Sequence, residues 1–166
     1  MPALIVGKMA PDFSLHALDG KTVSLHEFLE QGPVVLLFFK VSCPVCQFAF
    51  PLYERLAQAH KDSGATVLGV SQNKSSDAKA FAREYGVTFP IALDNDSNHY
   101  AVSNAYGLTN VPTLFYIAPS GEIEVSSVGW SKVEGDEVSA KLAALHREQP
   151  PLLWRNGEDV PAFRAG

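Results

Sequence analysis

The stretch that decides the fold spans residues 34–46 and reads VVLLFFKVSCPVC. Its first six residues are apolar on both faces of a pleated strand, which is typical of a central strand with helices on each side. A buried helix has the same apolar pattern, but six residues are short for one. Cys43 and Cys46 follow directly, and Pro44 suits the first position of a helix. The sequence therefore predicts a buried strand that leads into a helix at the two cysteines.

A helical stripe extends beyond the cysteines. Apolar side chains recur at steps of three and four residues, which places them on one helical face: Val45, Phe48, Leu52, Leu56 and Ala59. Pro51 lies inside this stripe and is expected to kink the helix, because proline has no N–H for the backbone ladder. Gly64 is the expected C-terminal cap of the helix.

Strands and helices alternate along the rest of the chain. The Asp-Gly turn at 19–20 predicts an N-terminal hairpin, and the capping box at 24–27 predicts a short helix. Further strands are expected at 65–71, 89–93, 113–117 and 122–125, and further helices at 76–85, at 97–106 and from 131 onward. This order predicts an α/β fold, a three-layer sandwich around a mixed central sheet with 122–125 as an antiparallel edge.

The length of 166 residues suits one domain, since a domain takes about 150 residues. We place that domain at 1–148 and a C-terminal tail at 149–166, because Pro150-Pro151 breaks the last helix. The tail is rich in apolar residues and is therefore expected to pack over the body of the domain. A contact with a partner or a second copy is the alternative, and the sequence does not set the oligomeric state.

Composition and charge exclude several classes of protein. The chain has 13 Lys and Arg against 18 Asp and Glu, and its net charge of −5 argues against nucleic-acid binding. The longest apolar run is six residues, whereas a membrane span needs about 20. The N-terminus shows no cationic start before a long apolar stretch, so we expect a cytoplasmic protein; an exported location is the alternative for a trimmed chain.

The spacing of Cys43 and Cys46 points to redox chemistry. Two residues between cysteines at a helix start bring the sulfurs close enough to close a disulfide. The N–H groups and positive dipole of the helix N-terminus favour the thiolate of Cys43. That thiolate attacks a substrate disulfide, and Cys46 then resolves the mixed disulfide. The expected redox group is the Cys43–Cys46 disulfide itself, with no other cofactor.

Other uses of the two cysteines fit less well. A zinc site needs about four ligands, but the chain has no second cysteine pair and its five histidines are scattered. We therefore expect no metal. Covalent haem requires a histidine after the second cysteine, where this chain has Gln47. A pair of inert buried thiols is the remaining structural alternative.

Taken together, these motifs resemble the thioredoxin-like superfamily. The similarity is closest to the redoxin branch, which contains TlpA/ResA-type thiol-disulfide oxidoreductases and AhpC/TSA-type peroxiredoxins. It covers about residues 9 to 147 and is carried by APDFSL at 10–15, LDGKTVSL at 18–25, the cysteine motif, Pro51, VPT at 111–113 and Gly129. The segment from about 75 to 98 matches the αβ unit that this branch inserts.

The resemblance implies a substrate site beside the cysteines. Pro112 would form a cis peptide bond that faces the disulfide, and Val111 would offer backbone groups to a bound peptide. Gly129 would flank the substrate groove. Trp130 is a candidate wall of that groove, and simple packing at the surface is the alternative. The implied partners are a protein or small-molecule disulfide and an unidentified dithiol donor.

Three supporting positions lie next to the cysteines. Pro44 and Val45 stand between them and influence the reduction potential. Lys40 ends the apolar strand, where its charge would help a nearby thiolate or would simply be solvated. The strand at 34–39 holds no acidic residue, so the group that accepts the Cys46 proton is not identified by the sequence.

Two further functions are alternatives to disulfide exchange. A thiol-dependent peroxidase with Cys43 as the peroxidatic cysteine is the alternative enzyme. However, the Pro-x-x-x-Thr/Ser-x-x-Cys pattern fails for both cysteines, and no arginine lies between Arg83 and Arg147 to polarise peroxide. A redox-inert binding module is the non-enzymatic alternative, but such a domain would not need both cysteines.

Overall fold

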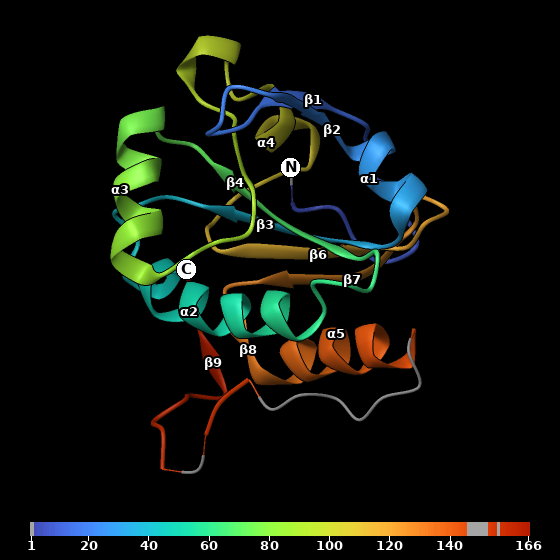
Figure 1. The fold of residues 1–166 in the computed structure, drawn as a ribbon, viewed down its shortest axis with the longest axis vertical. Coiled ribbons are helices and arrows are strands. Elements are labelled where there is room, and N and C mark those ends of the chain that lie inside the picture. Colours follow the sequence, from blue (N-terminus) through green and yellow to red (C-terminus); the bar gives the residue numbers. More distant parts are fainter. Residues whose placement is uncertain (1, 146–152, 156) are drawn as a thin grey trace.

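The structure, a computed structural model, describes residues 2–145, 153–155 and 157–166. A mixed sheet of five strands forms its centre, in the order β5-β4-β3-β6-β7 (Figure 1). The strands are β3 (Val34–Phe39), β4 (Thr66–Ser71), β5 (Ile91–Leu93), β6 (Thr113–Ile117) and β7 (Ile123–Val128). The pairs β3–β4 and β4–β5 are parallel, whereas β3–β6 and β6–β7 are antiparallel. The predicted mixed sheet is therefore confirmed.

The central strand β3 serves both faces of the sheet. All six of its side chains are fully buried. Successive side chains of a strand point to opposite faces, so Val35, Leu37 and Phe39 join one core cluster and the other three join a second. This explains why the run is apolar throughout rather than alternating.

Helices cover both faces of the sheet (Figure 1). One face packs against α2 (Pro44–Ala59), α3 (Ser75–Tyr85) and α5 (Lys132–Ala144). The other packs against α1 (Leu25–Gln31), α4 (Ala101–Ala105) and the hairpin of β1 (Ser14–His16) and β2 (Thr22–Ser24). These are the predicted three layers and N-terminal hairpin, and α3 with β5 supplies the predicted inserted unit.

The helix predicted at 97–106 is broken in the structure. A 3-10 turn, η1 (Asp96–Asn98), precedes α4, and the two residues between them have left-handed φ angles of 58° and 54°. The cause is the fully buried carboxylate of Asp94, which accepts hydrogen bonds from two backbone N–H groups of α4 at 3.2 and 2.6 Å. These bonds fix where α4 begins, so the chain must turn sharply before it.

The end of α2 also differs from the prediction. The helix ends at Ala59, and Gly64 is not its cap. The hydroxyl of Ser63 donates to the carbonyl of His60 at 2.6 Å and closes a turn there. Gly64 has a φ of 84°, and a Cβ at this position would lie 2.6 Å from the carbonyl oxygen of Gln31. Glycine is therefore needed where the chain passes the end of α1.

Segments of the chain lie along both edges of the sheet. Residues 4–10 run beside β7, and the N–H of Gly7 donates to the carbonyl of Ile123 at 2.9 Å. At the other edge, the N–H of Leu18 donates to the carbonyl of Ile91 at 3.0 Å. Backbone groups that would otherwise face solvent at these edges are thus paired within the molecule.

Part of the C-terminal tail packs on the body of the domain. Leu153 and Val160 are buried, and the short strand β9 (Phe163–Arg164) pairs antiparallel with β8 (Trp130–Ser131). The predicted boundary between 148 and 149 lies outside the described residues. Within the described part of the chain, no helix has the length and apolar character to cross a bilayer.

Glu54 ties α2 to the segment that precedes β5. Its carboxylate accepts hydrogen bonds from the backbone N–H and the hydroxyl of Thr88, at 2.8 and 2.6 Å, and from Gln58 at 2.8 Å. Partial burial raises the pKa of this carboxyl, but the bonds from Thr88 and Gln58 outweigh burial and hold the pKa below its usual value. The ionised form of Glu54 therefore stabilises the fold.

Replacing the Glu54 carboxylate tests these hydrogen bonds. We expect Glu54→Gln to lower the free energy of unfolding by about 1 kcal/mol at neutral pH, since the site is partly exposed and screened. Because the folded-state pKa is depressed, the difference is complete above the unfolded pKa of about 4.3 and disappears as pH falls through the folded pKa. Denaturant unfolding at a series of pH values measures it. Glu137→Gln, an exposed position on α5, is the control, and a pH-independent deficit in Glu54→Gln would contradict the assignment.

Candidate active site

The buried strand β3 ends shortly before the two cysteines. After a short loop, Cys43 is the N-cap residue of α2 and Pro44 stands at the first helical position, where its missing N–H costs nothing. Pro44 is exposed and Val45 is half-buried. Cys43 is also half-buried, whereas Cys46 has no exposed surface. The pair therefore has one sulfur that a substrate can reach and one that lies behind it.

The sulfur of Cys43 caps the start of α2. The N–H of Cys46 donates a hydrogen bond to the Cys43 Sγ at 3.3 Å. The sulfur thus takes the place of the side-chain oxygen that usually caps a helix. This end of the helix also carries the positive end of the dipole, so the Cys43 sulfur lies where backbone N–H groups of α2 point.

Cys46 has the opposite electrostatic environment. Burial raises the pKa of its thiol far above the usual value, and the hydrogen bond with the Cys43 sulfur raises it further. Cys46 is therefore protonated at neutral pH. Both cysteines are free thiols in the structure. Nowhere among the described residues do three potential metal-ligand side chains gather.

Hydrogen bonds fix the loop that precedes Cys43. The N–H of Val41 donates to Asn73 Oδ1 at 2.9 Å, and Gln47 Nε2 donates to the carbonyl of Val41 at 2.9 Å. Lys40 accepts from the N–H of Cys43 through its carbonyl at 3.2 Å, while its side chain is exposed. Lys40 was predicted from its place beside the cysteines, whereas Asn73 and Gln47 were not, because isolated amides carry no signal until the fold brings them to the loop.

The loop before β6 forms the second wall of the site. The Val111–Pro112 peptide bond is cis, as the family resemblance implied. The carbonyl of Val111 lies 3.5 Å from the Cys43 Sγ and accepts its hydrogen bond. The carbonyl of Pro112 accepts from the N–H of Gly129 at 2.7 Å. The fold therefore brings Cys43, Val111, Pro112 and Gly129 together.

Trp130 does not stand on the surface as a groove wall. Its side chain is fully buried, its Nε1 donates to the carbonyl of Pro161 at 2.8 Å, and its ring packs edge-on against Phe48 at 5.8 Å between centroids. Gly129 is covered too, since a Cβ there would lie 2.4 Å from the carbonyl oxygen of Arg164. The expectation of an open groove overlooked the tail, which pairs with β8 and covers this face.

Tyr53 is a buried neighbour of the pair that the sequence analysis did not single out. It lies two turns after Cys46 on the same face of α2. Burial raises the pKa of its hydroxyl, and a negative charge on Cys46 would raise it further. Its ring packs against Trp130 at 5.8 Å between centroids. The spacing of seven residues from Cys46 was the available signal.

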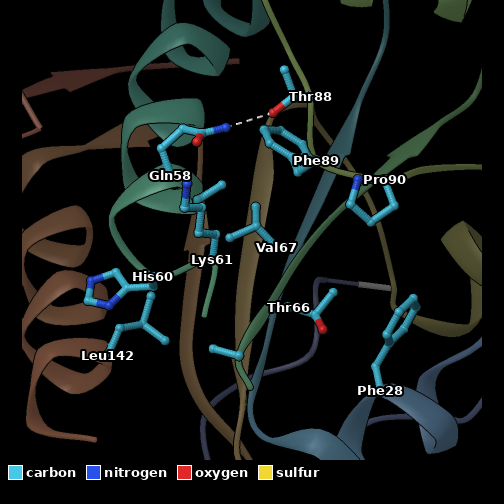
Figure 2. A pocket seen from close by; sticks show the side chains of 12 residues that line it. Phe28, Gln58, His60, Lys61, Thr66, Val67, Thr88, Phe89, Pro90 and Leu142 are labelled. Carbon is cyan, nitrogen blue, oxygen red and sulfur yellow. Dashed lines mark hydrogen bonds between the residues drawn. The ribbon is translucent and has the colours of Figure 1, made fainter. Parts of the chain in front are cut away.

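Pockets occur both beside the site and far from it. A pocket of about 310 Å³ lies beyond the last turns of α2, lined in part by Gln58, Lys61 and Thr88 (Figure 2). The 16 residues of α2 span about 24 Å, so this pocket is too distant to take part at the sulfurs. A smaller hollow of about 140 Å³ lies beside the site, between Lys40 and Val111.

Comparison with known proteins gives the family. The sequence profile of the AhpC/TSA family matches residues 6–126, a range that holds both cysteines and Pro112. The chain belongs to the AhpC/TSA family. The matched range ends before β8, so the tail that covers Trp130 lies outside it.

Relatives of this AhpC/TSA-family chain have named activities. It is 35% identical over 118 residues to the thiol-disulfide oxidoreductase ResA of Halalkalibacterium halodurans, which covers 70% of this chain and 65% of that protein. It is 32% identical over 123 residues to ResA of Geobacillus thermodenitrificans, covering 74% and 68%. The chain therefore spans about two thirds of the length of these relatives.

Solved structures agree with the fold. The thioredoxin domain of a thiol-disulfide oxidoreductase from Bacteroides vulgatus matches with a TM-score of 0.70 at 26% identity, over 76% of this chain and 90% of that one. A thiol:disulfide interchange protein from a Bacteroides species matches with a TM-score of 0.73 at 25% identity, over 85% and 90%. The chain shares the fold of these relatives and has a close pair of cysteines. It is therefore a thiol-disulfide oxidoreductase of the AhpC/TSA family with a thioredoxin-like fold.

The asymmetry of the pair predicts selective alkylation. In the reduced native protein, iodoacetamide should label Cys43 and spare Cys46, because only Cys43 is reachable and because burial raises the pKa of the Cys46 thiol. Mass spectrometry should show that Cys46→Ser is labelled at the wild-type rate, and that Cys43→Ser is labelled roughly a hundredfold more slowly until it is unfolded in denaturant. Equal labelling of the two native variants would contradict the assigned burial.

Proposed function

We propose that the chain exchanges disulfides with protein substrates, with Cys43 as the attacking sulfur and Cys46 as the resolving one. The asymmetry of the pair carries this proposal. A half-buried sulfur caps α2 at 3.3 Å from the N–H of Cys46, and the fully buried Cys46 thiol behind it has a raised pKa. Attack by Cys43 first and resolution by Cys46 second is the order that this arrangement supports.

The proposed reaction transfers two electrons from the pair to the substrate. The Cys43 thiolate attacks one sulfur of the substrate disulfide, that S–S bond breaks, and the leaving sulfur takes up a proton. Cys46 then gives up its proton and attacks the Cys43 sulfur, which closes the Cys43–Cys46 bond and releases the second substrate sulfur as a thiol. The pair is the redox group, no other cofactor is needed, and a dithiol donor regenerates it. A redox titration of the pair against glutathione shows which direction is favoured.

The backbone beside Cys43 supports a polypeptide substrate. The carbonyl of Val111 lies 3.5 Å from the Cys43 Sγ, where an extended chain with its cysteine at Cys43 could pair with it. Pro112 holds the adjoining loop against Gly129 through a 2.7 Å hydrogen bond. A small disulfide would need the sulfur of Cys43 alone, and the paired backbone therefore favours protein disulfides.

Insulin reduction tests the proposal. With dithiothreitol as donor, the wild type should precipitate insulin chains faster than dithiothreitol alone, and Cys43→Ser should fall to that background because the attacking sulfur is lost. When the reduced Cys46→Ser variant is mixed with insulin without dithiothreitol, it should accumulate a mixed disulfide that is visible on a non-reducing gel, because resolution is blocked. A wild type no faster than dithiothreitol alone would sink the proposal.

Peroxide reduction is the second candidate, because the matched family is AhpC/TSA and a reachable thiolate can be oxidised to sulfenic acid. We expect it to be slower than insulin reduction, since the chain lacks the peroxidatic motif around Cys43. Consumption of hydrogen peroxide with a thioredoxin or glutaredoxin donor measures it. A fast rate that Cys43→Ser abolishes would reverse the ranking of the two activities.

A further inference from the structure

Residues 160–166 form a strap across the face of the domain next to the cysteines. Its first residues are anchored, since Val160 is buried and the carbonyl of Pro161 accepts from Trp130 Nε1 at 2.8 Å. Beyond this anchor, β9 pairs antiparallel with β8, with Arg164 opposite Trp130. The edge of β8 is therefore occupied by the chain's own backbone.

The end of the strap reaches the residue that lies against the attacking sulfur. Asn110 Nδ2 donates to the carbonyl oxygen of Gly166 at 3.2 Å. A Cβ on Gly166 would lie 1.9 Å from the carbonyl oxygen of Val111, so the two backbones are in direct contact. The carbonyl oxygen of Val111 also lies 3.5 Å from the Cys43 Sγ. The strap thus fills the position where an extended substrate would pair.

The outer half of the strap is held mainly through its backbone. Residues 162–166 are all exposed, and Phe163 is 59% exposed. The N–H of Lys132 donates to the carbonyl of Ala162 at 2.9 Å, and the Arg164 guanidinium lies 5.2 Å from the ring centroid of Phe48. Backbone pairing of this kind is available to any extended polypeptide. Releasing the outer half would remove little apolar side-chain burial of its own, because its residues already face water, and would uncover the backbone of Gly129 and β8 that it covers.

We propose that the strap determines which substrates this enzyme accepts. It occupies the pairing edge until an extended polypeptide displaces residues 162–166, while Val160 and Pro161 stay anchored. The favoured partner is therefore an extended segment of an unfolded or partly folded protein that carries a cysteine in a disulfide. Small disulfides reach the half-buried Cys43 without displacing the strap. This inference rests on the proposed function, because it assumes that substrates pair at Val111.

The apparent affinity for polypeptides equals the intrinsic affinity multiplied by the fraction of time that the edge is open, so the strap lowers it. Arg164→Pro in the full chain removes an N–H from β9 and should open that edge. We expect kcat/KM for insulin to rise about tenfold, while turnover of bis(2-hydroxyethyl) disulfide stays at the wild-type rate. Arg164→Lys keeps the N–H and the positive charge near Phe48, and should match the wild type with both substrates.

Two results would overturn the strap's role. One is an insulin rate in Arg164→Pro that is unchanged or lower, and the other is an equal rise with insulin and with the small disulfide. A Gly166→Val variant gives a second test at the other end, since its Cβ cannot fit against Val111 and should favour insulin in the same selective way. If the wild type reduces neither substrate, the proposed function itself fails.

Hydrogen exchange tests displacement without changing the strap. Cys46→Ser is linked through Cys43 either to an extended peptide with a single cysteine or to cysteamine. We expect the amides of Lys132 and Arg164, which lie in the pairing of β8 with β9, to lose protection with the peptide and to keep it with cysteamine. If the amides stay protected in the peptide-linked protein, the inference is overturned. Formation of the mixed disulfide would still support attack by Cys43.

Discussion

The hydrogen bond from the N–H of Cys46 to the sulfur of Cys43 is the contact on which the chemistry depends, and the core decides where it forms. Such a bond contributes about 1 kcal/mol. Each large apolar side chain buried in β3 contributes about 2 kcal/mol, and all six residues of that strand are buried. Packing therefore dominates, since it sets the point at which the strand ends and the helix starts. The cap follows from that placement rather than causing it.

Local patterns in the sequence were enough to predict that the two cysteines lie together at the start of a helix. The apolar run, the two cysteines and Pro44 lie within thirteen consecutive residues, so no knowledge of the rest of the fold was needed. The approach of Val111 and Pro112 to Cys43 is different in kind. Cys43 and Val111 are 68 positions apart in the sequence. Without the structure, only the family resemblance placed them together.

The structural features that the sequence did not predict share a physical cause, which is contact between segments that are distant in the sequence. The strand β9 is two residues long with both side chains exposed, so it has no apolar pattern that could predict its pairing over Trp130. The break before α4 arises because Asp94 takes up N–H groups of a helix that follows it, and an acidic residue outside a helix gives no such warning. Tyr53 did have the right spacing from Cys46, but a buried tyrosine in an apolar stripe looks like ordinary core.

The pairing of residues 4–10 along β7, and of Leu18 with β5, bears on how safely this protein can handle unfolded chains. An open edge strand is a template for another polypeptide, and misfolded proteins are the molecules most prone to use it. Here the backbone of β7 is paired at Ile123 and that of β5 at Ile91, and release of the strap uncovers the two-residue edge of β8. Under the proposed function, these pairings leave less of the central sheet open to the backbone of a client polypeptide during sulfur exchange.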